Sequence, residues 1–178
     1  MAGEVLHVRD YRFSSADELF LDANVWLYIH GPQRPSRGPR THYYSSAFRR
    51  ILEAKCRIYI DVLVLSEVIN RWARFHYQES GTGFSFKAFR NSDAFKPIAL
   101  HIAADTRRIL RQCSPVESGF PTLDLDAVTA EYGDGRADFN DQVIRETCKR
   151  NLLKLVTDDA DFAGEGVTIL TANNRLLN

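Results

Sequence analysis

Apolar residues along the chain form two kinds of pattern, short continuous runs and stretches with helical spacing. The runs at 19–29 (LFLDANVWLYI), 57–62 (RIYIDV), 152–157 (LLKLVT) and 167–171 (VTILT) are typical of strands buried on both faces of a sheet. Apolar residues that recur every three or four positions predict helices over 43–55, 65–77, 97–112 and 138–150, and a shorter helix that ends near Gly133. Strands that alternate with helices predict an α/β fold of three layers, α/β/α, with a central and mainly parallel sheet.

Gly, Pro and small polar residues mark the breaks between these elements. GPQRPSRGPRTH (31–42) is expected to be a loop, because its Gly and Pro residues do not continue a helix or a strand. QESGTGFSFKAFRNSDAFKP (78–97) is predicted to be a loop with at most a helical turn, and to be an insertion in the domain. The length of 178 residues suits a single domain, 1–178, that is large enough to bury a substantial core.

The composition predicts a cytoplasmic protein without a membrane anchor. No apolar run approaches the roughly 20 residues that a membrane helix needs. The N-terminus, MAGEVLHVRDYRF, is charged and lacks the apolar core of a secretory signal. The three cysteines are widely spaced and include no CxxC pair, so we expect reduced thiols rather than a disulfide framework or a zinc site.

The charge balance argues against a protein that binds nucleic acid through bulk charge alone, because the formal net charge is zero. The cations are nevertheless uneven in kind, with 18 Arg against 5 Lys, and Arg is the better residue for bidentate contact with phosphate. Arg34, Arg37 and Arg40 gather in the loop 31–42, just beyond the first predicted strand. They are candidates for phosphate contact, although Arg is also common on exposed surfaces.

Four acidic residues lie at or just beyond the ends of predicted strands, or in helices that begin there. They are Asp22 in the first strand, Glu67 at the start of the helix after the second strand, Asp141 in the first turn of the helix 138–150, and Asp159 after the strand 152–157. Ligands of parallel sheets bind at the carboxyl ends of the strands, so we expect these acids to share one rim of the sheet.

Four neighbouring carboxylates repel one another and raise one another's pKa values. Divalent cations offset that repulsion, and shared ligation requires the carboxylates to converge within about 5 Å of one point. Because the pattern offers only oxygen ligands, Mg²⁺ or Mn²⁺ fits it better than zinc.

Each acid also has a structural explanation when it is taken alone. Asp22 can be a satisfied polar residue at a bend of the strand, and Glu67 can complement a helix dipole. Asp138 and Asp141 have the spacing of a capping box. The acidic turn 158–161 can be a solvated loop. The four acids together are therefore more specific than any one of them.

Three segments in order along the chain resemble the motifs of one known family. LDANVWL (21–27) is similar to an opening motif of an apolar residue, Asp, any residue and Asn, and VLVLSEVINRW (62–72) has a Glu where that family has its helical Glu. DQVIRETCKRNLLKLVTDDADF (141–162) is the most specific, because its first Asp lies sixteen residues before Thr157 and its end matches T-x-D-x-D-F. The family is that of the PIN-domain ribonucleases, which includes the toxins of VapBC-type toxin–antitoxin pairs. The resemblance covers residues 18–171.

The resemblance implies a metal-dependent endoribonuclease that uses Mg²⁺ or Mn²⁺. The catalytic residues, which would also be the metal ligands, are then Asp22, Glu67, Asp141 and Asp159. The residues that would orient these carboxylates are Asn24 and Thr157, with Ser66 and Asp161 as weaker candidates. The residues that would hold the RNA backbone are Arg34, Arg37 and Arg40. Asp138 and Asp158 compete with their neighbours for the metal roles, and the register of the motif favours Asp141 and Asp159.

A toxin role implies a cognate antitoxin as a partner and a homodimer, and two other classes of function stay open. A phosphohydrolase of the haloacid-dehalogenase type would use Asp22 as a phosphorylated nucleophile, but that family would have a second Asp where Asn24 stands. A catalytically inactive PIN-like module would bind RNA or a protein, and the presence of all four acids argues against it. The regions 78–97 and 114–136 are longer than in a compact toxin.

Overall fold

The computed structural model describes residues 3–31, 38–135, 138–162 and 166–177, which form a three-layer α/β/α fold. Its sheet has six parallel strands in the order β1-β6-β5-β2-β3-β4. The strands are β1 (Val5–His7), β2 (Glu18–Leu21), β3 (Arg57–Ile60), β4 (Ser114–Pro115), β5 (Lys154–Val156) and β6 (Ile169–Thr171). Because every strand is parallel, all six carboxyl ends lie on one rim.

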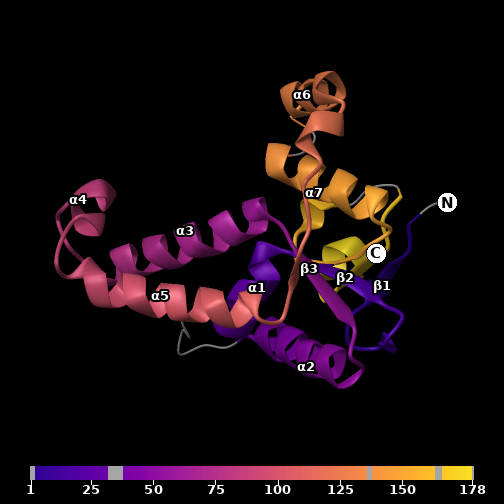
Figure 1. Ribbon diagram of the computed structural model, residues 1–178, viewed down its shortest axis with the longest axis horizontal. Helices are drawn as coiled ribbons and strands as arrows, with labels where there is room; N and C mark the ends of the chain where they lie inside the picture. Colours follow the sequence, from indigo (N-terminus) through magenta and orange to yellow (C-terminus); the bar gives the residue numbers. More distant parts are fainter. Residues whose placement is uncertain (1–2, 32–37, 136–137, 163–165, 178) are drawn as a thin grey trace.

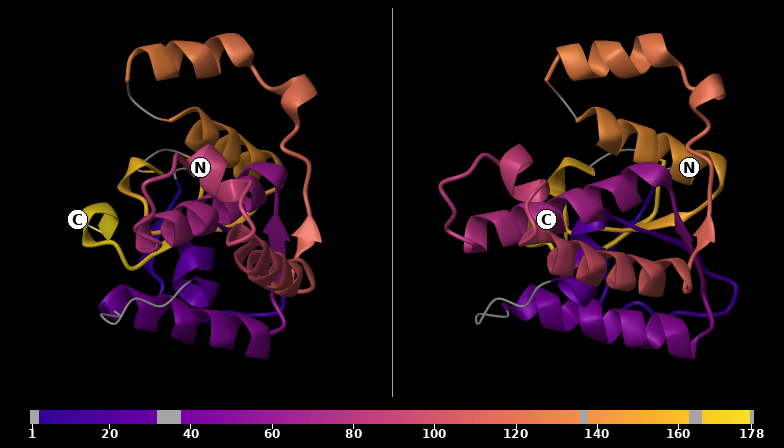
Figure 2. Two further views of the ribbon diagram at one scale, coloured as in Figure 1. Left: turned by 90° about the vertical axis from the view of Figure 1, so that its left-hand side faces the viewer. Right: turned by 60° about the vertical axis from the view of Figure 1, so that its left-hand side comes forward.

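The helices cover both faces of this sheet. They are α1 (Ala23–His30), α2 (Pro39–Glu53), α3 (Val62–Glu79), α4 (Phe86–Arg90), α5 (Phe95–Leu110), α6 (Leu125–Gly133), α7 (Phe139–Arg150) and α8 (Asn174–Leu177), with short 3₁₀ turns η1 (Phe120–Thr122) and η2 (Ala160–Phe162). Helix α1 packs against α2 and α3 on one face, and α7 lies across the other (Figures 1 and 2). Helices α3 and α5 run side by side into an arm with α4 at its tip, and α6 stands beyond α7 (Figure 1).

The centre of the core is β2, which lies between β3 and β5 and packs helices on both faces. Leu19, Phe20 and Leu21 have no exposed surface. The neighbouring β5 residues Leu155 and Val156 are almost as fully buried. A strand buried on both faces carries a continuous apolar run, and this explains why the sequence pattern located β2 and β5.

The prediction of one strand over 19–29 is wrong in its second half. The strand ends at Leu21, Asp22 caps the next helix, and α1 buries Ala23, Val25 and Trp26. A short apolar run has no periodicity that separates a strand from a buried helix, so the run concealed the boundary. Asp22 is the local signal for it, because Asp is a favoured residue at a helix N-cap.

Other predicted elements are present with shifted bounds. The helix expected over 43–55 begins earlier, at Pro39, where proline suits the first helical turn. The helix expected over 65–77 begins at Val62 and continues to Glu79, and the helix expected over 97–112 is α5. Strands β1 and β4 and the helix α8 had no counterpart among the predicted elements, because each spans at most four residues.

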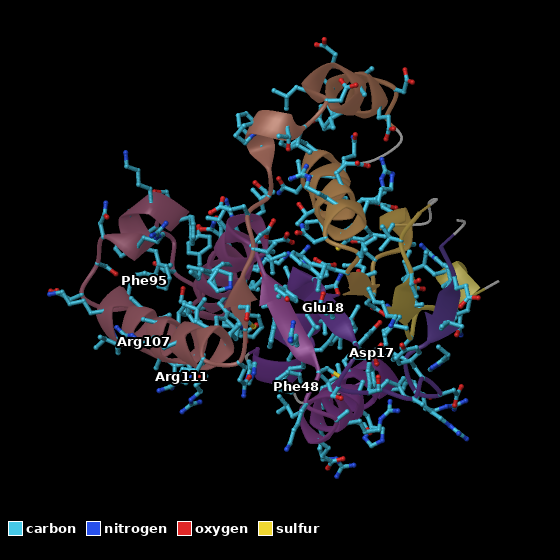
Figure 3. All side chains as sticks on the ribbon, turned by 45° about the vertical axis from the view of Figure 1, so that its right-hand side comes forward. Asp17, Glu18, Phe48, Phe95, Arg107 and Arg111 are labelled. Carbon is cyan, nitrogen blue, oxygen red and sulfur yellow. The ribbon has the colours of Figure 1, made fainter. Side chains whose placement is uncertain are left out.

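The segment 78–97 contains the end of α3, the helix α4 and the start of α5. It is therefore more helical than predicted. The ring of Phe89 contacts that of Tyr77, just before this segment, and that of Phe95, which Figure 3 labels. The status of this segment as an insertion stays a prediction. Among the described residues, no helix is both long enough and apolar enough to cross a membrane.

Candidate active site

Asp22 lies at the junction of β2 and α1, on the carboxyl rim of the sheet, with only 5% of its surface exposed. One carboxylate oxygen, Oδ1, accepts the backbone N–H of Ala23 at 2.6 Å. The other, Oδ2, accepts the hydroxyl of Thr157 at 2.8 Å and the side-chain amide of Asn24. These contacts fix the orientation of the carboxylate from both sides.

Asn24 and Thr157 join the start of α1 to the turn that follows β5. The amide of Asn24 also lies 3.3 Å from Thr157 Oγ1, and its Oδ1 accepts the backbone N–H of Asp158 at 3.1 Å. Thr157 Oγ1 in turn accepts the backbone N–H of Asp159 at 3.0 Å. The structure thus places Asn24 and Thr157 in contact with Asp22, and Thr157 in contact with the backbone of Asp159. Their role in orienting metal ligands stays a prediction.

Asp141 lies in the first turn of α7, and Asp138 caps that helix by accepting the backbone N–H of Asn140 at 2.8 Å. Burial raises the pKa of Asp141 to about 7, and the charges of Asp22, Asp159, Asp138 and Glu67 add to this effect. The cap role predicted for Asp138 is confirmed, and Asp141 is the half-buried acid of the pair that interacts with the other acids.

Burial also raises the pKa of Asp22 to about 6, against the hydrogen bond from Thr157, and the charges of Glu67 and Asp159 raise it further. The charges of Glu67 and Asp159 therefore act on both Asp22 and Asp141, although the four residues come from four separate elements. We call these four residues, Asp22, Glu67, Asp141 and Asp159, the acid cluster. Like charges in a partly desolvated site cost free energy, which a cation would offset.

Glu67 lies in the second turn of α3, since Asp61 is the N-cap and α3 has no acidic residue in its first turn. The alternative that Glu67 complements the helix dipole is therefore wrong, because this effect is confined to the first turn. In the structure, Glu67 forms an ion pair with Arg71 at 3.1 Å. Ser66 is exposed, and its hydroxyl accepts a hydrogen bond from Asn70 at 3.3 Å. Among the described residues, no hydrogen bond joins Ser66 to an acid of the cluster.

The acidic turn after β5 separates its three aspartates by role. Asp158 is buried and accepts hydrogen bonds from Tyr28 at 3.0 Å, Arg40 at 2.9 Å and Tyr44 at 3.0 Å. This network holds α1 and α2 against the end of β5. Asp158 thus has a structural role in joining these elements.

The other two aspartates of this turn are more accessible. Asp159 is half-buried and stays free of the Asp158 network, while Asp161 is exposed and donates its backbone N–H to Asp159 Oδ1 at 3.1 Å. This arrangement favours Asp159 over Asp158 as the acid of the cluster. It supports a role for Asp161 through its backbone, which positions the Asp159 carboxylate.

The three arginines that the sequence singled out have different outcomes. Arg34 and Arg37 lie outside the described residues. Arg40 lies in the first turn of α2, and its guanidinium is bound to Asp158, although 49% of the side chain is exposed. The guanidinium of Arg40 is therefore already engaged by Asp158. If Arg40 also binds RNA, the same guanidinium has to contact both groups.

Sequence reasoning missed two residues that shape the site. Asp61 is buried and caps α3, the helix that carries Glu67, by accepting the backbone N–H of Val64 at 2.9 Å. The available signal was an acid near the end of the otherwise apolar predicted strand 57–62, which in the structure ends at Ile60. Tyr44 is also buried, and its hydroxyl lies 2.9 Å from the Thr157 carbonyl oxygen, but a helical aromatic residue gives no such signal.

The acid cluster has the donor chemistry of a magnesium or manganese site. Within residues 3–31, 38–135, 138–162 and 166–177, however, no three His, Cys, Asp or Glu side chains lie together as a ready-made metal site. The expected convergence of the four acids within about 5 Å of one point is therefore not observed. Mg²⁺ usually keeps several waters and takes only one or two carboxylates directly, so the described acids fit it through water.

Comparison with protein-family models matches residues 19–164 to the PIN domain, which is most of the chain. The chain belongs to the PIN-domain family. PIN domains are generally nucleases that use divalent metals such as Mg²⁺. Membership of the PIN family removes the basis for the haloacid-dehalogenase alternative. No curated protein matches the sequence.

Proposed function

We propose that this PIN domain is a Mg²⁺- or Mn²⁺-dependent endoribonuclease whose catalytic residues are Asp22, Glu67, Asp141 and Asp159. One observation carries the proposal: in this PIN fold, burial and the charges of Glu67 and Asp159 raise the pKa values of Asp22 and Asp141, which come from separate elements. Such a cluster is costly for folding and is therefore expected to serve a cation.

The chain's own residues would hold the cation and orient it toward RNA. The carboxylate of Asp22, which is held by hydrogen bonds from Thr157, Asn24 and the Ala23 N–H, would already be oriented for the cation. Glu67 would exchange its ion pair with Arg71 for the cation or a bound water. A bound divalent ion lowers the pKa of a water and stabilises negative charge on the leaving oxygen.

The first test is cleavage of a mixed RNA pool by the purified protein, with and without millimolar Mg²⁺ or Mn²⁺. Asp22→Asn and Asp141→Asn should each abolish metal-dependent cleavage while the fold is kept, because the change is nearly isosteric. Asp93→Asn is the matched control, since Asp93 is exposed on the arm and pairs with Lys96 at 2.8 Å. Cleavage retained in either cluster variant would refute the site, and a wild type that never cleaves would favour an inactive RNA- or protein-binding module.

We also propose that the protein is the toxin of a toxin–antitoxin pair, with a cognate antitoxin as partner and a homodimer as its assembly. The motifs at 21–27, 62–72 and 141–162 support this, because they resemble those of PIN-domain toxins. A small reading frame upstream with a DNA-binding pattern would support the pair. Sedimentation of the purified chain as a monomer would refute the homodimer.

A further inference from the structure

A cavity lies beside the carboxyl end of β1, at the outer edge of the sheet. It opens between α2 and the loop after β1, has a volume of about 280 Å³, and is lined by Arg9, His42, Tyr43, Ser46 and Arg50. None of its lining residues belongs to the acid cluster or to the residues that orient it. The volume is close to the lower end of small-molecule pockets, about 300 Å³, so the cavity suits a single small group.

One wall of this cavity is formed by residues on one side of α2, including Arg50. Tyr43, Ser46 and Arg50 are spaced three and four residues apart, which places them on one side of α2. The guanidinium of Arg50 donates to the carbonyl oxygens of Val8 at 2.6 Å and Tyr11 at 2.9 Å. Arg50 therefore ties α2 to the loop after β1 and makes the cavity a preformed feature.

The lining combines aromatic rings with positive charge. The Tyr43 ring meets the His42 ring edge to face at 6.3 Å and the His7 ring at 5.5 Å. Arg9 pairs with Asp10 at 3.1 Å, but both side chains are mostly exposed, at 60% and 65%. An exposed pair of this kind contributes little to stability, so Arg9 can exchange Asp10 for a phosphate.

The cavity lies within reach of an RNA strand bound at the acid cluster. Strand β6 lies between β1 and β5, so the ends of β1 and β5 are about 10 Å apart at ordinary strand spacing. The residue after Tyr43 is Tyr44, whose hydroxyl contacts the Thr157 carbonyl and the Asp158 carboxylate. Adjacent residues of α2 thus face the cavity and the turn that carries Asp159.

We propose that this cavity binds one unstacked nucleotide of a single-stranded RNA that also reaches the acid cluster. This inference rests on the proposed nuclease function. The base stacks on the Tyr43 ring, and Arg9 binds the adjoining phosphate. A paired duplex does not fit, because its bases remain stacked on one another and the cavity admits one base.

The test is fluorescence anisotropy with a labelled single-stranded oligoadenylate RNA in the presence of chelator, so that no cleavage intervenes. Tyr43→Ala should weaken binding about 5- to 100-fold, and Tyr43→Phe should restore it because the ring is kept. Arg9→Ala should weaken binding and lower the slope of log affinity against log salt by about 0.7, the value of one phosphate contact on a single strand. Asp10→Asn should tighten binding, because it removes the competing carboxylate.

Arg49→Ala is the matched control, because Arg49 lies on α2, pairs with Glu53 at 3.9 Å and does not line the cavity. Equal affinities in all variants, or an equal loss in Arg49→Ala, would overturn the proposal. Duplex RNA that binds as tightly as the single strand would also overturn it. If binding follows this pattern but the wild type cleaves no RNA, the result would support nucleotide binding in the cavity and refute only the nuclease function.

Discussion

Two buried aspartates at opposite ends of β2 show what is unusual about Asp22. Asp17, just before β2 (Figure 3), accepts hydrogen bonds from Tyr11 and the Ser14 N–H at 2.8 Å and forms an ion pair with Lys154. Burial opposes its charge, but these partners, Lys154 first, lower its pKa. The donors that the structure gives Asp22 are all neutral, and its pKa is raised to about 6. A divalent ion would give Asp22 the compensation that Lys154 gives Asp17.

The same imbalance predicts that Asp141→Asn stabilises the metal-free protein at high pH. The pKa of Asp141 is about 7 in the folded chain and about 3.9 in the unfolded one. Its favourable contribution to folding is therefore complete below about pH 4 and is lost as the pH rises through about 7. With chelator at about pH 8, Asp141→Asn should melt a few degrees above wild type, and the difference should vanish near pH 4.

Thermal melts of Asp141→Asn, Asp93→Asn and wild type across this pH range would test the prediction. Asp93 is exposed, so its variant should follow wild type throughout. A gain in Asp141→Asn that does not change with pH would show that the charge of Asp141 is not its cause.

At the scale of elements, the sequence predicted the buried strands, the long helices and the acids at their ends. It failed where a strand passes into a helix with a single polar residue between them, as at Asp22 between Leu21 and Ala23, and where a strand is as short as β4. Long periodic segments are recognised from their own residues. A short edge strand forms because a neighbouring strand pairs with it, so its own residues give little indication that it is a strand.

Helix N-caps fix where the helices that carry the site residues begin. Asp61 is the N-cap of α3, the helix that carries Glu67. Asp61→Ala should cost about 1 kcal/mol of folding free energy, because it leaves the start of α3 uncapped. It should also lower cleavage, because α3 positions Glu67. Asp61→Ser should restore both stability and cleavage, since Ser also caps helices. Its neutral side chain avoids the cost of burying a charge, which raises the pKa of Asp61.

The control for this prediction is Asp124→Ala. Asp124 caps α6 by accepting the Ala127 N–H at 3.0 Å, and α6 carries no residue of the acid cluster. Urea unfolding and initial cleavage rates should show a loss of stability alone in Asp124→Ala. A matching loss of cleavage would mean that capping acts on activity only through overall stability.

At the scale of the whole molecule, one hydroxyl joins three parts of the fold. Tyr44 on α2 lies 2.9 Å from the Thr157 carbonyl at the end of β5 and accepts the Ala172 N–H, after β6, at 2.9 Å. Tyr44→Phe should cost about 1–3 kcal/mol in urea unfolding, because it leaves the buried Ala172 N–H without its acceptor. Tyr132→Phe, at an exposed tyrosine of α6, should change stability little. Equal midpoints for the two variants would contradict this role of Tyr44.

Because the acid cluster draws on α1, α3, α7 and the turn after β5, a bound cation would stabilise the molecule as a whole. Millimolar Mg²⁺ or Mn²⁺ should raise the melting temperature of wild type by binding the folded chain alone. The gain should shrink in Asp22→Asn and stay complete in Asp93→Asn. Sodium chloride at equal ionic strength separates this effect from screening of the like charges, which needs no site. Equal shifts in wild type and Asp22→Asn would mean that the cation binds elsewhere, and the acid cluster would then lose its proposed function.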